Sequence, residues 1–353
     1  TQILAGLFFL LALSSTGHCA PTEVKLGATL PLTGRLAVVG QDVKRGIELG
    51  VEDFASDEVK VVPLFEDNQH EPRQAIASAH KLLDVDKVDV IVSMWDMADI
   101  IAPLAEQKKV PQIAIRWNPD IAQRYKYTFT IESTYQSYCD SLLELVKKLS
   151  VDSISLITEE GQGWILASDY LKAKAPAANI KILSDERFIS EAADYRTLIL
   201  RAVKKKPGMV VLFTNPPHTE ALIKQFRDSA PAQKFTGYFE VVDPALVEGI
   251  PFVAQFDVAD WFNEKFRHRF DDTPKSRAAQ AYDLVYLLTR AAKHAKAVPG
   301  PDSIIEVLSS DELKSGAAGP LFVTAGKTVE SKNVWKIAHE GKYTIWNGVL
   351  TNK

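Results

Sequence analysis

The stretch VKLGATLPLTGRLAVVGQDVKRGIELGVEDF, residues 24–54, decides the fold. Its first seven residues form a β-rich run that predicts a strand over 24–30. From Val43 to Phe54 the apolar residues recur near helical spacing, which predicts a helix. A strand that leads through a short turn into a helix opens a βαβ unit, so this stretch indicates a parallel sheet with helices on its faces.

The same alternation of strands and helices continues along the chain in two series. Strands of the first series are predicted at 59–66, 88–93, 111–117 and 127–133, with helices at 72–83 and 99–106. A long helix from residue 135 leads into the second series, which has strands at 153–158, 180–188, 209–214 and 234–239 and helices at 164–174, 195–205 and 219–226. A helix at 278–295 and a hairpin at 335–346 follow. The chain therefore predicts two α/β sheets, and the late helix is placed to return to the first of them.

Length and composition exclude several classes of protein. The 353 residues, 46% hydrophobic and 24% charged, are enough for two globular domains. A net charge of -4 argues against binding to nucleic acid. With Cys19 and Cys139 as the two cysteines, a disulfide framework cannot hold the fold together, so a packed core must do so.

The first twenty residues have the pattern of an export signal. The apolar run Ile3–Leu13 is too short to span a bilayer but matches the core of a signal peptide. We expect residues 1–20 to be removed, with cleavage after Gly17, Cys19 or Ala20, and the mature chain to be exported and soluble. Cys19 leaves lipidation open, although His18 occupies the position where lipoprotein signals usually carry a small residue.

Candidate ligand-binding residues follow the predicted strands, because ligands of open α/β sheets bind beyond the carboxyl ends of the strands. These residues are Ser93, Trp95 and Asp96 after the strand at 88–93, Arg116 and Trp117 after the next strand, and Gln162, Trp164 and Glu240 in the second series. A single tryptophan in such a turn commonly packs under a loop. Three tryptophans at equivalent turns favour a shared cleft with aromatic walls.

Each polar candidate has a functional and a structural interpretation. Arg116 can clamp a carboxylate of the ligand with paired N–H donors, or form a salt bridge to Asp96 or Glu240. Ser93 can donate its hydroxyl to the same anion, or cap a helix. Asp96 and Glu240 can hold an ammonium group, or remain solvated in their loops.

Signatures of catalysis are sparse in this sequence. Gly161-Gln162-Gly163 is a fragment of a dinucleotide fingerprint, but the third glycine would fall at Leu166. The histidines show no metal-ligand spacing, and no nucleophile elbow or phosphate-binding loop is present. Cys139 lies within a helical pattern and is expected in the core. We therefore expect neither an enzyme, a cofactor nor a metal site.

The order of several segments resembles the leucine/isoleucine/valine-binding family of periplasmic solute receptors. These segments are KLGATLPLTGRLAVVGQDVKRGIELGVEDF, EDNQHEPRQAIASAHKLL, VDVIVS, VPQIAI, YTFTIE, AYDLVYLL and GPLFVTAGKT, and the resemblance covers residues 24 to about 346. The resemblance implies a type I periplasmic binding fold, in which two Rossmann-like lobes with parallel sheets are joined by three crossovers. It implies an N-terminal lobe of residues 22–132 plus about 258–325, and a C-terminal lobe of residues 133–257 plus about 326–353.

The resemblance also implies where the ligand binds. The family's contacts fall near residues 93–97, on Arg116 and Trp117, and at Gln162-Gly163, where relatives have Tyr-Gly. Glu240 matches the acidic partner of an ammonium group, and Tyr282 belongs to the family's Ala-Tyr-Asp helix. A buried arginine and aspartate would be costly beside a purely aliphatic side chain, which argues against a branched-chain amino acid.

The expected function is capture of a small carboxylate-bearing solute, an amino acid or an aromatic or other organic acid, for an ABC importer. This implies a periplasmic monomer that meets the permease subunits of the importer. A module that signals ligand occupancy to a membrane partner is the alternative, and an exported hydrolase is disfavoured for want of a nucleophile and base motif.

Overall fold

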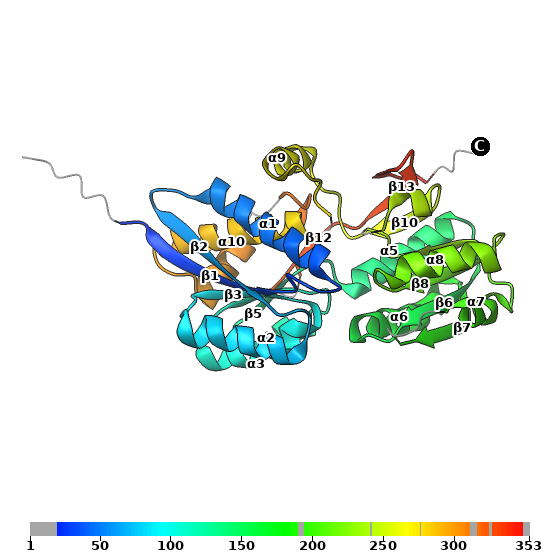
Figure 1. Ribbon diagram of the computed structural model, residues 1–353, viewed down its shortest axis with the longest axis horizontal. Helices are drawn as coiled ribbons and strands as arrows, with labels where there is room; N and C mark the ends of the chain where they lie inside the picture. The colour runs from blue at the N-terminus through cyan, green and yellow to red at the C-terminus, as the bar shows by residue number, and fades with distance from the viewer. Residues whose placement is uncertain are drawn as a thin grey trace, which may run out of the picture.

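The computed structural model describes residues 20–189, 194–240, 242–275, 277–310, 316–324 and 327–348. Apart from Ala20, the predicted signal peptide lies outside the described residues, as does Cys19. None of the described helices is long and apolar enough to cross a membrane. Figure 1 shows two α/β lobes lying side by side along the long axis.

The first lobe is built on a seven-stranded sheet with the strand order β11-β12-β5-β4-β3-β1-β2. All neighbouring strands are parallel except β11 and β12. The strands are β1 (Thr22–Leu30), β2 (Val59–Asp67), β3 (Val90–Met94), β4 (Gln112–Ile115), β5 (Thr128–Ile131), β11 (Leu321–Thr324) and β12 (Thr328–Ser331).

Helices cover both faces of this sheet. On one face lie α1 (Ala37–Phe54), α10 (Ala278–Ala295) and α11 (Pro301–Ser309), and on the other lie α2 (Pro72–His80) and α3 (Trp95–Lys108) (Figure 1). The bounds of α10 agree with the predicted helix at 278–295, and its return to the first sheet is confirmed. Helices α1 and α10 pack so closely that a Cβ atom at Gly46 would collide with the backbone of Ala278. A glycine is therefore required at this crossing.

The second lobe has a parallel four-stranded sheet and a small antiparallel one. The parallel sheet has the order β7-β6-β8-β9, from β6 (Ser153–Glu159), β7 (Lys181–Phe188), β8 (Met209–Phe213) and β9 (Phe235–Gly237). The antiparallel sheet joins β10 (Pro251–Ala254) to the hairpin of β13 (Val334–His339) and β14 (Lys342–Ile345). Helices α5 (Tyr135–Lys148) and α6 (Gln162–Lys174) cover one face of the parallel sheet, and α7 (Arg196–Val203) and α8 (His218–Ser229) cover the other.

The chain passes between the lobes three times, after β5, after β10 and after β12, and α9 (Asp260–Phe270) follows the second crossing. The hydroxyl of Ser133 lies 3.0 Å from the carbonyl oxygen of Gln255 and 2.7 Å from that of Ser331, so it ties the three crossings together. Residues 328–331, which the sequence places in the second lobe, form β12 and pair with β5 in the first sheet. The third crossing thus follows Ser331.

Candidate functional site

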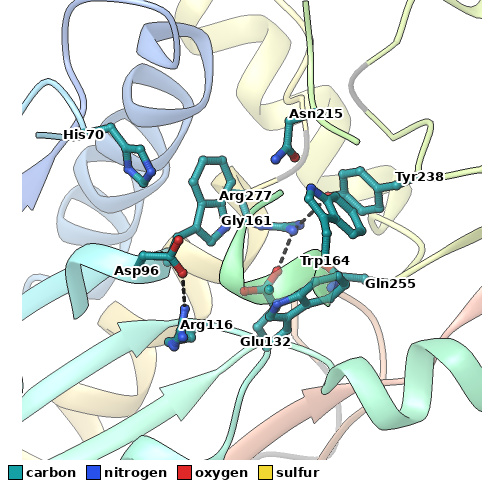
Figure 2. A pocket seen from close by; sticks show the side chains of 13 residues that line it. His70, Asp96, Arg116, Glu132, Gly161, Trp164, Asn215, Tyr238, Gln255 and Arg277 are labelled. Atoms are coloured by element: carbon teal, nitrogen blue, oxygen red, sulfur yellow. Dashed lines mark hydrogen bonds and ion pairs between the residues drawn. The ribbon is translucent and has the colours of Figure 1, made fainter. Parts of the chain in front are cut away.

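A cavity lies between the two lobes, at the carboxyl ends of strands from both sheets. It encloses about 570 Å³ of space, part of it open to solvent. The lining residues are His70, Trp95, Asp96, Arg116, Trp117, Glu132, Gly161, Gly163, Trp164, Asn215, Tyr238, Gln255 and Arg277, most of which are labelled in Figure 2.

Trp95 lines the cavity from the first residue of α3, a helix that begins earlier than the sequence predicts. The helix was expected from residue 99, but it starts at Trp95, directly after β3. Trp95 has φ +49°, a left-handed conformation that costs a bulky residue roughly 1–2 kcal/mol. Backbone strain of this kind collects at ligand sites, where the surrounding structure holds a side chain in place.

The predicted tryptophans all line this one cavity. Trp117, from the loop after β4, meets Trp164 of α6 edge to face, with ring centroids 4.8 Å apart. Trp164 in turn lies 5.5 Å from the ring of Tyr238, from the loop after β9. Since Trp117 belongs to the first lobe and the other two rings to the second, an aromatic wall spans the gap between the lobes.

Arg116 lines the cavity, but its charge is already matched by acidic neighbours. Its side chain is 1% exposed, with Nη1 2.9 Å from a carboxylate oxygen of Asp96 and Nη2 2.7 Å from one of Asp99. Nη2 also donates a hydrogen bond of 3.2 Å to Oε1 of Gln162 in the second lobe. Of the two interpretations of Arg116, the geometry shows the salt bridge to Asp96 and adds Asp99 to it. Burial raises the pKa of Asp99, and the positive charge of Arg116 opposes that rise.

A second buried arginine, Arg277, holds the floor of the cavity together. Its Nη2 lies 2.5 Å from Oε1 of Glu132 and donates a hydrogen bond of 2.8 Å to the hydroxyl oxygen of Tyr238 (Figure 2). Its Nη1 lies 3.4 Å from Glu240, which also accepts a hydrogen bond of 2.8 Å from the Tyr238 hydroxyl. Burial raises the pKa values of Glu132 and Tyr238, and the guanidinium of Arg277 acts against both shifts.

Four of the predicted site residues do not line the cavity. Ser93 is fully buried, and its hydroxyl oxygen accepts a hydrogen bond of 2.7 Å from Gln112. Tyr282 packs among aromatic side chains of the first lobe, and its hydroxyl donates to Asp53 at 2.7 Å. Glu240 contacts the lining residues Arg277 and Tyr238, and Gln162 contacts the lining residue Arg116.

Several lining residues are absent from the candidates that the sequence supplied. Asn215 and Tyr238 follow β8 and β9, Glu132 follows β5, and His70 lies three residues beyond β2, so the rule about strand ends extends to them. Arg277 has no such signal, because it precedes a helix and meets Glu132 from 145 residues away. Ser93 does not line the cavity because alternate residues of a strand face opposite sides of the sheet, and the side chain of Ser93 points into the packed interior.

The described residues contain no group of three or more His, Cys, Asp or Glu side chains that could hold a metal ion.

Cys139 is buried in α5, where burial raises the pKa of its thiol well above the usual range and its Sγ lies 3.4 Å from the carbonyl oxygen of Ala167. A thiol in such surroundings is a poor nucleophile. The expected place of Cys139 in the core is confirmed.

Two α/β lobes that present the ends of their strands to one shared cavity define a class of proteins that hold small ligands between lobes. The chain belongs to the periplasmic binding protein family, whose model matches residues 23–332. The resemblance drawn from the sequence is therefore confirmed.

Among curated proteins, the chain is similar to the Leu/Ile/Val-binding protein homolog 8 of Brucella suis. The two are 25% identical over 247 residues, which cover 65% of this chain and 61% of the relative. The chain thus spans about 61% of the length of such curated relatives.

Solved structures have the same fold. The leucine binding protein LivK of Thermotoga maritima is 21% identical, with a TM-score of 0.82 and coverage of 92% of this chain and 97% of that chain. A solute binding protein of an ABC transporter from Rhodopseudomonas palustris, in complex with 3,4-dihydroxybenzoic acid, is 20% identical with a TM-score of 0.82 and coverage of 92% and 96%. The predicted type I periplasmic binding fold is confirmed.

Proposed function

We propose that this chain is the extracytoplasmic solute-binding protein of an ABC importer and captures a small organic solute in the cavity between its lobes. The observation that carries the proposal is the cavity itself, which takes its lining from the strand ends of both lobes. A solute held there touches both lobes at once, so its binding energy favours the arrangement in which they are closed around it.

The three crossings supply the hinge that this function needs. We propose that residues 22–132 and about 258–331 move as one lobe, and residues 133–257 and about 332–348 as the other. In the part of the chain that the structure describes, only the three crossings link the two lobes covalently, and the hydroxyl of Ser133 contacts the other two crossings at Gln255 and Ser331. Closure about such a hinge requires changes at only a few backbone positions.

Features of the cavity suit a small carboxylate-bearing molecule, the class of solute proposed from the sequence. Gly161 and Gly163 lie at the start of α6, and the amino end of a helix favours a negative charge. The aromatic wall of Trp117, Trp164 and Tyr238 suits the apolar part of an amino acid or an aromatic acid. Leucine and 3,4-dihydroxybenzoic acid, which are named for two of the similar proteins, are small carboxylate-bearing molecules of the proposed kind.

The proposed partners are the permease subunits of the importer, which the chain meets as a periplasmic monomer. We further propose that the solute leaves the cavity chemically unchanged. Arg116 and Arg277 are both held in ion pairs, which suits binding, and the Cys139 thiol is buried in the core and does not line the cavity.

A thermal-shift screen of amino acids and organic acids on residues 21–353 tests this proposal, because a ligand of the folded state raises the melting temperature. Trp95→Ala, in the cavity, should abolish the shift, whereas Trp261→Ala, on α9, should retain it. Mass spectrometry should recover the solute intact after incubation. Equal binding to both variants, or conversion of the solute, would contradict the proposal.

A further inference from the structure

We propose that the cavity selects, among carboxylate-bearing solutes, one of net positive charge, a cationic amino acid. This inference depends on the proposed function and specifies the charge of the solute that the same cavity takes. Three features support it: the charges around the cavity, two buried oxygen atoms that lack a hydrogen-bond donor, and aromatic rings that lack a cation.

The cavity is lined by two guanidinium groups and two carboxylates, those of Asp96 and Glu132, and two further carboxylates lie behind this lining. Each of the two buried arginines is paired with two acidic side chains: Asp96 and Asp99 around Arg116, and Glu132 and Glu240 around Arg277. Four carboxylates therefore surround two cations. A solute carboxylate approaching either arginine meets a guanidinium whose charge is already paired with two carboxylates, although Nε of Arg116 has no acceptor within the described part of the chain, whereas a solute cation meets the excess negative charge.

Of the neighbouring basic groups, Arg124 acts on Asp99, whereas His70 and Arg35 add no net charge at the cavity. Burial lowers the pKa of His70, so its imidazole is neutral at pH 7. Arg35 lines the outer part of the cleft together with Glu220, and this pair adds no net charge. The side chain of Asp96 remains 41% exposed beside Arg116, so it is accessible to a solute.

Two acceptor oxygens at the floor of the cavity are buried without a donor among the described residues. They are Oε2 of Glu132, whose side chain is 2% exposed, and Oε1 of Gln255, which is fully buried. A buried acceptor that makes no hydrogen bond costs roughly 1–3 kcal/mol, and more when it is charged. Both side chains line the cavity, so an N–H donor of the solute would satisfy these oxygens.

No lysine or arginine of the chain occupies the aromatic rings of the cavity within the described residues. Lysine or arginine groups lie over five rings there, and none of those rings is Trp95, Trp117, Trp164 or Tyr238. The face of an indole or phenol attracts an ammonium group, most strongly where water is excluded. The aromatic walls, together with the carboxylates of Asp96 and Glu132 that Figure 2 labels, form an environment that recognises an organic cation.

Two sets of probes that share a carbon skeleton and differ in charge test the proposal by titration calorimetry. The first set is hexanoate, norleucine, lysine and hexylamine, and the second is 3-phenylpropanoate, phenylalanine, phenylalaninamide and 3-phenylpropylamine. We expect a cation of at least one set to bind roughly tenfold or more tightly than the zwitterion and the anion of its set. Tighter binding of a zwitterion or an anion, or no binding by any cation, would overturn the proposal.

Variants that remove one negative charge place the effect in the cavity. Asp96→Asn should weaken binding of the preferred cation about tenfold, and Glu132→Gln should weaken it more because Glu132 is buried. Glu144→Gln, on the exposed side of α5, is the matched control and should change nothing. If Glu132→Gln fails to fold, Asp96→Asn alone decides, because its side chain is partly exposed. Unchanged affinity in Asp96→Asn would overturn the proposal.

The outcomes separate this inference from the proposed function. Preference for an anion or a zwitterion, lost in Trp95→Ala, would leave solute capture intact and remove only the assignment of charge. Binding of cations equally by the wild type, Trp95→Ala and Asp96→Asn would place the cations outside the cavity and contradict both.

Discussion

Gln162 in the second lobe accepts a hydrogen bond of 3.2 Å from the guanidinium of Arg116 in the first lobe. The two residues lie 46 positions apart and reach each other across the edge of the cavity. The bond links α6 to the loop after β4, so it is made only when the lobes are close together. It therefore joins solute capture to the arrangement of the lobes.

Replacement of Gln162 by alanine is expected to weaken solute binding about fivefold. The substitution removes a hydrogen bond to a charged group, and because Gln162 is exposed, that bond contributes about 1 kcal/mol. Titration calorimetry with the solute found in the screen measures the change. Glu160→Ala, two residues away and also exposed, is the control and should bind normally. Unchanged affinity in Gln162→Ala would show that this bond plays no part in closure.

A methyl group at Gly163 is expected to hold the lobes apart. The Cβ of an alanine there would lie 2.7 Å from Nε1 of Trp117, so the indole or the whole lobe must shift. Gly161→Ala is the control, because its nearest neighbour would be 4.0 Å away. Small-angle scattering with solute should show a larger radius of gyration for Gly163→Ala than for Gly161→Ala. Equal radii and equal affinities would contradict this prediction.

Loss of Arg116 is expected to destabilise the protein even without solute. Arg116→Ala leaves Asp96 and Asp99 without their cation, which should lower the free energy of unfolding by about 1–3 kcal/mol, less than for a fully buried pair because both carboxylates are partly exposed. Urea denaturation of the empty protein measures this change. Arg196→Ala, which breaks an exposed pair with Asp194, should leave the midpoint unchanged. Full stability of Arg116→Ala with loss of solute binding would instead support the carboxylate clamp.

Stability is expected to depend on pH through Asp283. Burial raises the pKa of Asp283 to about 7, although its carboxylate accepts hydrogen bonds from the backbone of Ala317 and Ala318. The folded state then binds a proton that the unfolded state releases near pH 4, so this contribution to stability is present at low pH and lost as the pH rises to about 7. Urea denaturation at pH 5 and pH 8 should show a loss of a few kcal/mol in the wild type that Asp283→Asn lacks. Parallel pH profiles for the two proteins would refute this role of Asp283.

Local pattern was enough to predict the class of fold and most of the alternating elements, but not α9, α11 or the strands β10, β11 and β12. The alternation of strands and helices depends on the spacing of apolar residues within short windows, and helix α10 begins and ends where that spacing predicts. The position of a ligand site at the carboxyl ends of strands follows from the topology of parallel sheets. For this reason the tryptophans that wall the cavity could be chosen from the order of segments alone.

What the sequence by itself determined is therefore the two-lobed α/β architecture and the strand ends that meet at the cavity, since both depend on residues near one another in the chain. Only the tertiary structure decided which charges meet there. Arg277 finds Glu132 from 145 residues away, and Arg116 is neutralised by Asp96 and Asp99 from a different strand end. The physical reason is that a charged side chain pairs with an opposite charge that the folded lobes bring within about 4 Å. The spacing of residues along the chain does not reveal which side chains come that close.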